Sequence, residues 1–163
     1  MMLIPTNHIT VLYSQDLTKA LELYEAQKSE KKTALIYNDW ETIPYLSLSD
    51  NLYLGVSRKL RKAQTNRALF QLLGLDSTIL RKPIEELTYF QRLRLQIMQQ
   101  LLRQPEQLLF LDVTEHLSIK ETQDLLHYIY GLVAQRDLDV VFITQNASLA
   151  TSLQQTMPQK TQD

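Results

Sequence analysis

A run of four apolar residues, 108–111, followed at once by the carboxylate of Asp112, most constrains how this chain can fold. An uninterrupted run of this kind is expected of a central strand in a parallel sheet, because helices cover both faces of such a sheet. Open α/β sheets bind their ligands at the carboxyl ends of the strands. The run therefore predicts an α/β fold with a candidate site residue at Asp112.

The residues before this strand have the pattern of an amphipathic helix. Apolar side chains recur at intervals of three and four, and neighbouring apolar residues widen the stripe to Leu95, Ile97, Met98, Leu101 and Leu102. Pro105 follows, where a residue that cannot continue a helix is expected. The segment predicts a helix, a short loop and then the buried strand.

Three more apolar segments, 8–12, 33–37 and 140–144, are predicted strands. A helix is predicted after the first, because Leu17, Leu21 and Tyr24 recur on one helical face. Alternating strands and helices are typical of a parallel sheet.

Two helix boundaries are also readable from the sequence. A helix is predicted over residues 57–73, and Gly74 stands at the position where glycine commonly ends a helix. Ser118 and Glu121 have the spacing of a capping box and predict the start of another helix. The tail from Gln154 is polar, and we expect it to fray.

Composition narrows the classes of protein. The length of 163 residues fits one domain, the net charge of −1 offers no basic field for nucleic acid, and the lack of cysteine excludes disulfides and thiolate chemistry. His8, His116 and His127 show no metal-ligand spacing. No signal peptide is evident, and no apolar run approaches the ~20 residues of a membrane helix. We expect a soluble, cytoplasmic protein.

Residues 87–113 resemble the part of ABC-transporter ATP-binding subunits that runs from the signature motif to the Walker B strand. Leu87, Thr88, Gln91, Arg92 and Arg94 match the signature, and residues 108–112 match the strand and its aspartate. Three positions depart from the family: Tyr89 and Phe90 replace two glycines, and Val113 replaces the catalytic glutamate. The resemblance is strong over about 45–150 and weak over the first 40 residues.

The resemblance implies a fold and a domain organisation. The expected architecture is a P-loop-NTPase-like three-layer α/β fold with a mostly parallel sheet and no antiparallel β arm. The whole chain, 1–163, would be a single degenerate nucleotide-binding domain, with a helical insertion at about 41–92. Residues 45–52 resemble the start of that insertion, and Asn38 or Asp39 falls near the glutamine of the family's Q-loop.

The phosphate-binding loop departs furthest from the family. A P-loop needs glycines that let backbone N–H groups wrap the phosphates, followed by lysine and a hydroxyl residue. Tyr13 and Thr18 stand at the glycine positions, Lys19 at the lysine and Ala20 at the hydroxyl residue. A left-handed backbone at Tyr13 and Thr18 would cost about 1–3 kcal/mol each. A solvated helix lysine is the favoured interpretation of Lys19 over a phosphate ligand.

The resemblance also assigns the remaining site residues. Gln145 stands at the switch histidine and Ile119 at the D-loop aspartate. A vestigial nucleotide site would consist of Lys19, Thr88, Asp112 and Gln145. Asp112 would bind Mg²⁺, or it would simply cap the turn after its strand. We expect no catalytic residue and no bound cofactor; Mg·ATP would be the ligand of any site that is retained.

The leading functional hypothesis is a non-hydrolysing accessory or regulatory subunit of a membrane transporter. Its partner would be a permease subunit or a second ATP-binding subunit, held at the inner face of the membrane through the transporter. Two alternatives stay open: a shortened ATPase subunit that binds nucleotide, and a free-standing protein-interaction module.

Two surface features have two interpretations each. Tyr89 and Phe90 form an aromatic contact surface or pack against Tyr45 and Leu46, with neither favoured. Residues 58–67 contain five Lys or Arg. A solvated helix face is favoured there over a patch for lipid headgroups or nucleic acid, since no aromatic residues interleave the charges.

Overall fold

A computed structural model of the chain describes residues 9–27, 32–37, 39–62 and 65–156. The chain forms two compact units. The first comprises residues up to Tyr37, Pro105–Glu115 and Tyr130 onward, and the second comprises Asn38–Gln104 and His116–Ile129. The predicted strands all fall in the first unit, and the predicted insertion at 41–92 falls in the second.

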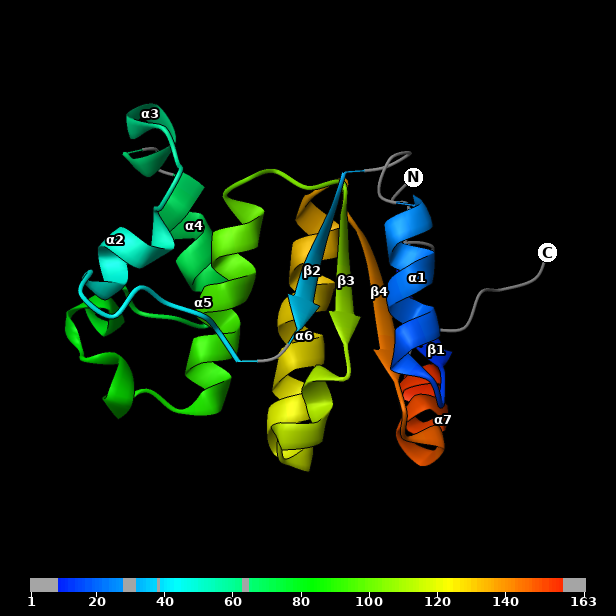
Figure 1. Cartoon of the computed structure of the whole chain (residues 1–163). Helices are drawn as coiled ribbons and strands as arrows, with labels where there is room; N and C mark the ends of the chain where they lie inside the picture. The colour runs from blue at the N-terminus through cyan, green and yellow to red at the C-terminus, as the bar shows by residue number, and fades with distance from the viewer. Residues whose placement is uncertain (1–8, 28–31, 38, 63–64, 157–163) are drawn as a thin grey trace. The chain divides into compact units, whose positions relative to one another are not determined.

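The first unit is built on a parallel sheet in the order β1-β4-β3-β2 (Figure 1). The strands are β1 (Ile9–Tyr13), β2 (Thr33–Tyr37), β3 (Gln107–Leu111) and β4 (Asp139–Thr144). The predicted α/β fold with a mostly parallel sheet is confirmed. The first strand is shifted by one residue from the predicted 8–12, and His8 lies outside the described residues.

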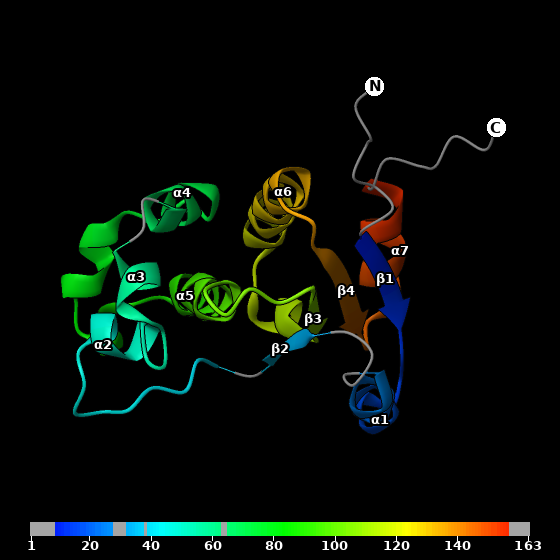
Figure 2. The same ribbon diagram turned by 90° about the horizontal axis from the view of Figure 1, so that it is seen from above.

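Helices cover both faces of this sheet. Helix α1 (Leu17–Gln27) lies on one face and α7 (Ala147–Thr156) on the other (Figure 2). Ala20 of α1 packs in a cluster with Leu109, Leu111 and Ile143. Phe110 points to the opposite face, because side chains alternate along a strand. The three-layer arrangement predicted from the sequence is thus confirmed.

Helix α7 has no counterpart among the predicted helices. Its sequence is rich in Ser, Thr and Gln and shows little apolar periodicity, so the helix start depends on a cap. The Asn146 side chain accepts a hydrogen bond from Leu149 N at 3.0 Å, and Ala150 is buried. The expectation of a frayed tail from Gln154 is wrong as far as Thr156, where the helix ends.

The second unit is helical between β2 and β3. It contains α2 (Leu48–Leu52), α3 (Arg58–Arg61), α4 (Thr65–Leu72) and α5 (Tyr89–Leu101), with short 3₁₀ helices at Ser77–Arg81 and Ile84–Glu86. The predicted apolar stripe of α5 is buried throughout. Helix α6 (Ile119–Gln135) begins with the predicted capping box, since Ser118 N donates to Glu121 Oε1 at 3.0 Å and Glu121 N donates to Ser118 Oγ at 3.1 Å.

The single helix predicted over 57–73 is wrong. The chain forms α3 and α4 there, and residues 63–64 lie outside the described part of the chain. The reason is the buried amide of Asn66, whose Nδ2 donates to Leu60 O at 2.7 Å and to Arg61 O at 2.8 Å. The last carbonyls of α3 are thereby satisfied by a side chain instead of by another helical turn.

The predicted helix end at Gly74 is confirmed. Gly74 has φ +64°, and Leu75 N donates to Phe70 O at 2.8 Å, which is the bond of a Schellman motif. A β-carbon at Gly74 would collide with the ring of Tyr128, which lies against Phe90 and Arg94. Both the backbone conformation and the space therefore require glycine.

Replacing this glycine tests the two requirements separately. Gly55 also has a left-handed backbone, φ +77°, but nothing lies within 4 Å of an added β-carbon. We expect Gly55→Ala to lower the free energy of unfolding by about 1–2 kcal/mol from backbone strain. Gly74→Ala should lower it by about 1–3 kcal/mol more, because its β-carbon overpacks the site. Urea denaturation measures both, and equal losses would show that Tyr128 moves aside freely.

The helices of the described residues are short. The longest, α6, has 17 residues, and none is long and apolar enough to cross a bilayer.

Candidate functional site

The carboxyl edge of the sheet holds Asp112, immediately after β3. Its backbone N–H donates to Ile143 O of β4 at 2.7 Å, and its φ is +53°. Aspartate is one of the few side chains that enters this left-handed region, and doing so still costs about 1–3 kcal/mol. The structure therefore confirms the predicted place of Asp112 at the end of a buried parallel strand. It adds that the backbone of Asp112 is strained there.

Gln145 directly follows β4 and contacts one residue after β3 and one residue after β1. Its backbone N–H points to Asp112 Oδ1 at 3.4 Å, and its side-chain Nε2 points to Gln15 O at 3.4 Å. Because β4 lies between β1 and β3, the residue after β4 is the one that can reach both neighbours. The exposed amide of Gln145 can donate and accept hydrogen bonds but cannot take up a proton at neutral pH.

The connection between β1 and α1 is only the three residues Ser14, Gln15 and Asp16. Tyr13 remains in β1, paired with Thr144, and Thr18 is already in α1. Neither has a positive φ, so the strain predicted for these two residues does not arise. The chain avoids it by forming a short turn instead of a loop that wraps a phosphate.

A carboxylate occupies the start of α1. Asp16 Oδ1 accepts a hydrogen bond from Thr18 N at 3.0 Å, and Asp16 O accepts one from Ser14 Oγ at 3.0 Å. Helix N-termini bind anions through these free N–H groups and the helix dipole. Here the chain supplies its own anion. Asp16 is not among the predicted site residues, although an aspartate directly before a helical stripe is a known cap signal.

Lys19 lies one turn further along α1. Its side chain is exposed and has no acidic partner among the described residues. Lys19, Asp112 and Gln145 all belong to the first unit, whereas Thr88 belongs to the second.

The hydroxyl of Thr88 caps helix α5. Thr88 Oγ1 accepts a hydrogen bond from Gln91 N at 3.1 Å, and Gln91 Oε1 accepts one from Thr88 N at 2.9 Å. Two residues matched to the signature motif therefore form a capping box. This hydrogen bonding accounts for Thr88 without a nucleotide.

The two aromatic residues after Thr88 pack inside the second unit. Phe90 is buried, stacks on Tyr128 with ring centroids 6.3 Å apart and lies 4.3 Å under the Arg94 guanidinium. Half-buried Tyr89 meets His116 edge-on at 5.4 Å. The packing interpretation is correct, but the partners of Phe90 are on α6 and α5, and the partner of Tyr89 is on the 3₁₀ helix Val113–His116. Packing of Phe90 against Tyr45 is wrong, since Tyr45 is 86% exposed.

Arg92 ties the signature turn to the segment after β2. Its Nε donates to Asp39 Oδ1 at 2.9 Å, and its Nη1 donates to Leu87 O at 2.6 Å. Burial alone would raise the pKa of Asp39, but the hydrogen bonds from Arg92 and from Trp40 N–H outweigh burial, so the pKa is below its ordinary value. Asn38, the other residue predicted near the Q-loop position, lies outside the described residues.

This ion pair should be visible in the pH dependence of stability. Since folding lowers the pKa of Asp39, its contribution is present above the unfolded-state value of about 3.9 and is lost as pH falls through the lower folded value. We expect Asp39→Asn to lower the free energy of unfolding at pH 7 and to differ less from wild type as the solution is acidified below about pH 4. Chemical denaturation at each pH measures it. Arg92→Gln should show the same convergence, and parallel curves would contradict this assignment.

Val113, the residue at the position of the family's catalytic glutamate, has a buried side chain. Val113 begins the 3₁₀ helix Val113–His116 and is 3% exposed, whereas Glu115 points to solvent. The described residues contain no group of three or more His, Cys, Asp or Glu arranged to hold a metal ion. A Mg²⁺ ion here would have Asp112 as its protein ligand and would depend on nucleotide phosphates for others. That role of Asp112 stays a prediction.

The architecture is similar to that of solved ABC cassettes. The chain matches the dimeric structure of a post-hydrolysis state of the ATP-binding cassette MJ0796 bound to ADP and Pi, with a TM-score of 0.64 and 15% identity over 92% of this chain and 79% of that chain. The chain therefore has the fold of an ABC cassette. No protein-family model matches the chain.

Curated relatives of the chain are molybdenum import ATP-binding proteins named ModC. Identity is 28% over 123 residues to the protein of Rhodobacter capsulatus and 25% over 118 residues to that of Mannheimia succiniciproducens. The matches cover 75% and 72% of this chain, respectively, but only 34% and 33% of the relatives. The chain therefore spans about a third of the length of the curated relatives it matches, and its resemblance to ABC-transporter ATP-binding subunits is confirmed.

Proposed function

We propose that the chain is a degenerate ABC-type nucleotide-binding domain that does not hydrolyse ATP and acts as an accessory or regulatory subunit of a membrane transporter. One observation carries the proposal: the Asp16 carboxylate caps α1 in a three-residue turn without glycine. A triphosphate at this helix would meet a like charge and would find no loop of N–H groups to surround it.

The groups needed for hydrolysis are also missing. A hydrocarbon side chain, Val113, stands where a base would orient water, and Gln145 stands where a histidine would act. Loss of one general base typically lowers a rate by about 10²–10⁴. Phosphoryl transfer depends on positioning and electrostatics, so loss of the phosphate cradle as well leaves little to compensate.

The partners we propose follow from the relatives. Those proteins are named as import ATP-binding proteins, and a similar cassette is dimeric. We place this chain at the cytoplasmic face of a membrane, bound to a permease subunit or to a second ATP-binding subunit. The helical insertion at 41–92 and the segment after Asp39 would make the contact. Affinity purification from the native cell tests this, and recovery of neither kind of subunit would count against it.

Calorimetry with Mg·ATP tests the nucleotide site directly. Because Asp16 occupies the start of α1, we expect no saturable heat from the purified chain, and no difference between wild type and Lys19→Ala. Lys120→Ala is a matched control, since Lys120 is also an exposed lysine in the first turn of a helix. Saturable binding that Lys19→Ala abolishes and Lys120→Ala preserves would overturn the proposal.

A second candidate function is nucleotide binding by a shortened ATPase subunit. The observation that favours it is the contact between Asp112 and Gln145, which keeps the expected Mg²⁺ ligand beside the switch position. The same titration decides between the two functions, because only this one requires saturable binding of Mg·ATP.

A further inference from the structure

The single helical turn α3 carries the densest positive charge of the chain and contributes no buried residue to the core. Helix α3 has four residues, Arg58–Arg61, and none of them is buried. A long amphipathic helix over 57–73 would explain these charges as its solvent face. Because α3 is a separate turn, its basic residues are not required by the packing of α4.

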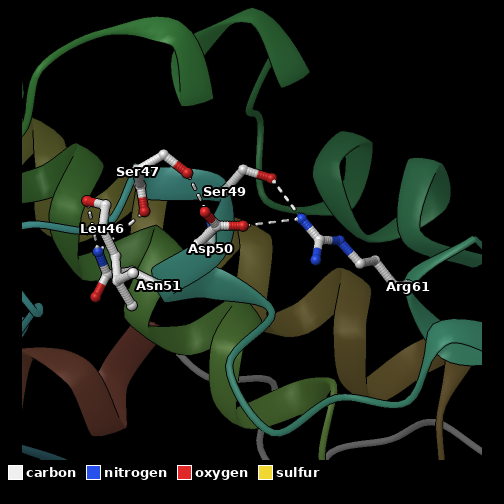
Figure 3. Close-up of polar contacts among 6 residues, drawn as sticks. All are labelled: Leu46, Ser47, Ser49, Asp50, Asn51 and Arg61. Carbon is white, nitrogen blue, oxygen red and sulfur yellow. Dashed lines mark hydrogen bonds and ion pairs between the residues drawn. The ribbon is translucent and has the colours of Figure 1, made fainter.

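Four of the five basic residues over 58–67 have no acidic partner among the described residues. No acidic residue lies between Asp50 and Asp76 in the sequence. Asp50 Oδ1 lies 3.3 Å from Arg61 Nη2, which also donates to Ser49 Oγ at 3.4 Å (Figure 3). The other cationic side chains are exposed and have no acidic partner among the described residues: Arg58, Lys59, Lys62 and Arg67.

The backbone of the turn is held at both ends. Ser57 Oγ accepts a hydrogen bond from Leu60 N at 3.3 Å at the start, and the Asn66 amide satisfies the carbonyls of Leu60 and Arg61 at the end. Arg61 lies 5.0 Å from the centroid of the Tyr53 ring. A surface that is already ordered loses little entropy when it binds.

An exposed leucine lies just before these charges in the sequence. Leu54 is 46% exposed and follows Tyr53, the residue on which Arg61 stacks. The next residue, Gly55, turns the chain with φ +77° toward the start of α3. Leucine next to Lys and Arg is the combination by which peripheral proteins bind the interface of a bilayer.

We propose that this lipid-binding turn, defined as Leu54, Arg58, Lys59, Lys62 and Arg67, docks onto an anionic phospholipid surface. Each basic residue near such a surface contributes separately to binding, and Leu54 would enter the boundary between headgroups and acyl chains. This contact would be made by the chain itself and is independent of a permease subunit.

Other partners fit the turn less well. A helix of one turn is too short to read a DNA groove, and the sequence over 58–67 contains no aromatic residue to stack on single-stranded bases. Lysine is depleted at protein–protein interfaces. Two of the four basic residues without an acidic partner among the described residues are lysines, Lys59 and Lys62, which makes a protein partner less suitable. A fluid lipid surface needs only positive charge and an apolar side chain.

Vesicle sedimentation with the full chain tests the proposal. We expect the chain to sediment with phosphatidylcholine vesicles that contain phosphatidylserine, not with pure phosphatidylcholine, and to be released by salt. R58Q/K59Q should weaken partitioning by about 25-fold, since each charge contributes about fivefold. The matched control is R81Q/K82Q, an exposed Arg-Lys pair on the 3₁₀ helix end, which should leave partitioning close to wild type.

Leu54→Ser should weaken binding at low salt without reducing its salt dependence, because the contribution of Leu54 is apolar and is not screened. Equal losses in R58Q/K59Q and R81Q/K82Q would overturn the proposal, since net charge would then account for binding. Binding to pure phosphatidylcholine at the same level would also overturn it, as would retention on duplex DNA or polyglutamate at a salt concentration where vesicles release the chain. All variants alter exposed side chains, so unchanged thermal unfolding serves as the folding control.

Discussion

Introducing a carboxylate at the family's catalytic position, Val113→Glu, is expected to lower the free energy of unfolding by about 3–5 kcal/mol and to produce no ATPase activity. Val113 is 3% exposed in the first turn after Asp112. A glutamate there would be a buried charge without a cationic partner, unless the turn opened. The substitution would therefore disrupt the fold at the position where a functional cassette needs its base.

The control separates charge from shape. Val113→Gln introduces nearly the same volume without a charge, so it should be less destabilising than Val113→Glu at pH 7. Burial would raise the pKa of the new carboxyl in the folded state, and the added penalty is lost as pH falls toward the unfolded-state value of about 4.3. Chemical denaturation from pH 7 to pH 4 should show the two variants converging. Equal stabilities at pH 7, or phosphate release from Mg·ATP, would contradict this account.

The strands could be predicted from sequence because burial on both faces leaves a local signal. Residues 108–111 and 140–143 are apolar without interruption, and the structure places them in the two central strands. The meeting of Asp112 and Gln145 then follows from topology. Each comes directly after one of two adjacent parallel strands, so both reach the same edge of the sheet.

The features that could not be predicted from the sequence depend on single polar side chains. The break between α3 and α4 is made by the buried amide of Asn66, and the closed start of α1 by the carboxylate of Asp16. Neither changes the apolar periodicity from which helices are predicted. The partner of Phe90 is missed for another reason, since Tyr128 lies far along the chain and only the tertiary structure brings it into contact.

Truncating a side chain at the centre of the sheet should lower the free energy of unfolding by as much as the buried carboxylate of Val113→Glu. Phe110 is 0% exposed, pairs in register with Phe142 and stacks on it with ring centroids 4.7 Å apart. We expect Phe110→Ala to lower the free energy of unfolding by about 3–5 kcal/mol, because it loses the transfer free energy of the ring and leaves a cavity.

An exposed residue of the same sheet provides the comparison. Leu12→Ala, at a 46% exposed position of β1, should change the free energy of unfolding by about 0.5 kcal/mol. Urea denaturation followed by circular dichroism measures both variants. The stacked pair contributes beyond its buried area, so Phe110→Leu and Phe142→Leu should show a coupling of about 0.5–1.5 kcal/mol in a double-mutant cycle. Strictly additive losses would show that the two rings act as independent apolar groups, and that the register of β3 and β4 is set by the backbone and by the remaining buried pairs.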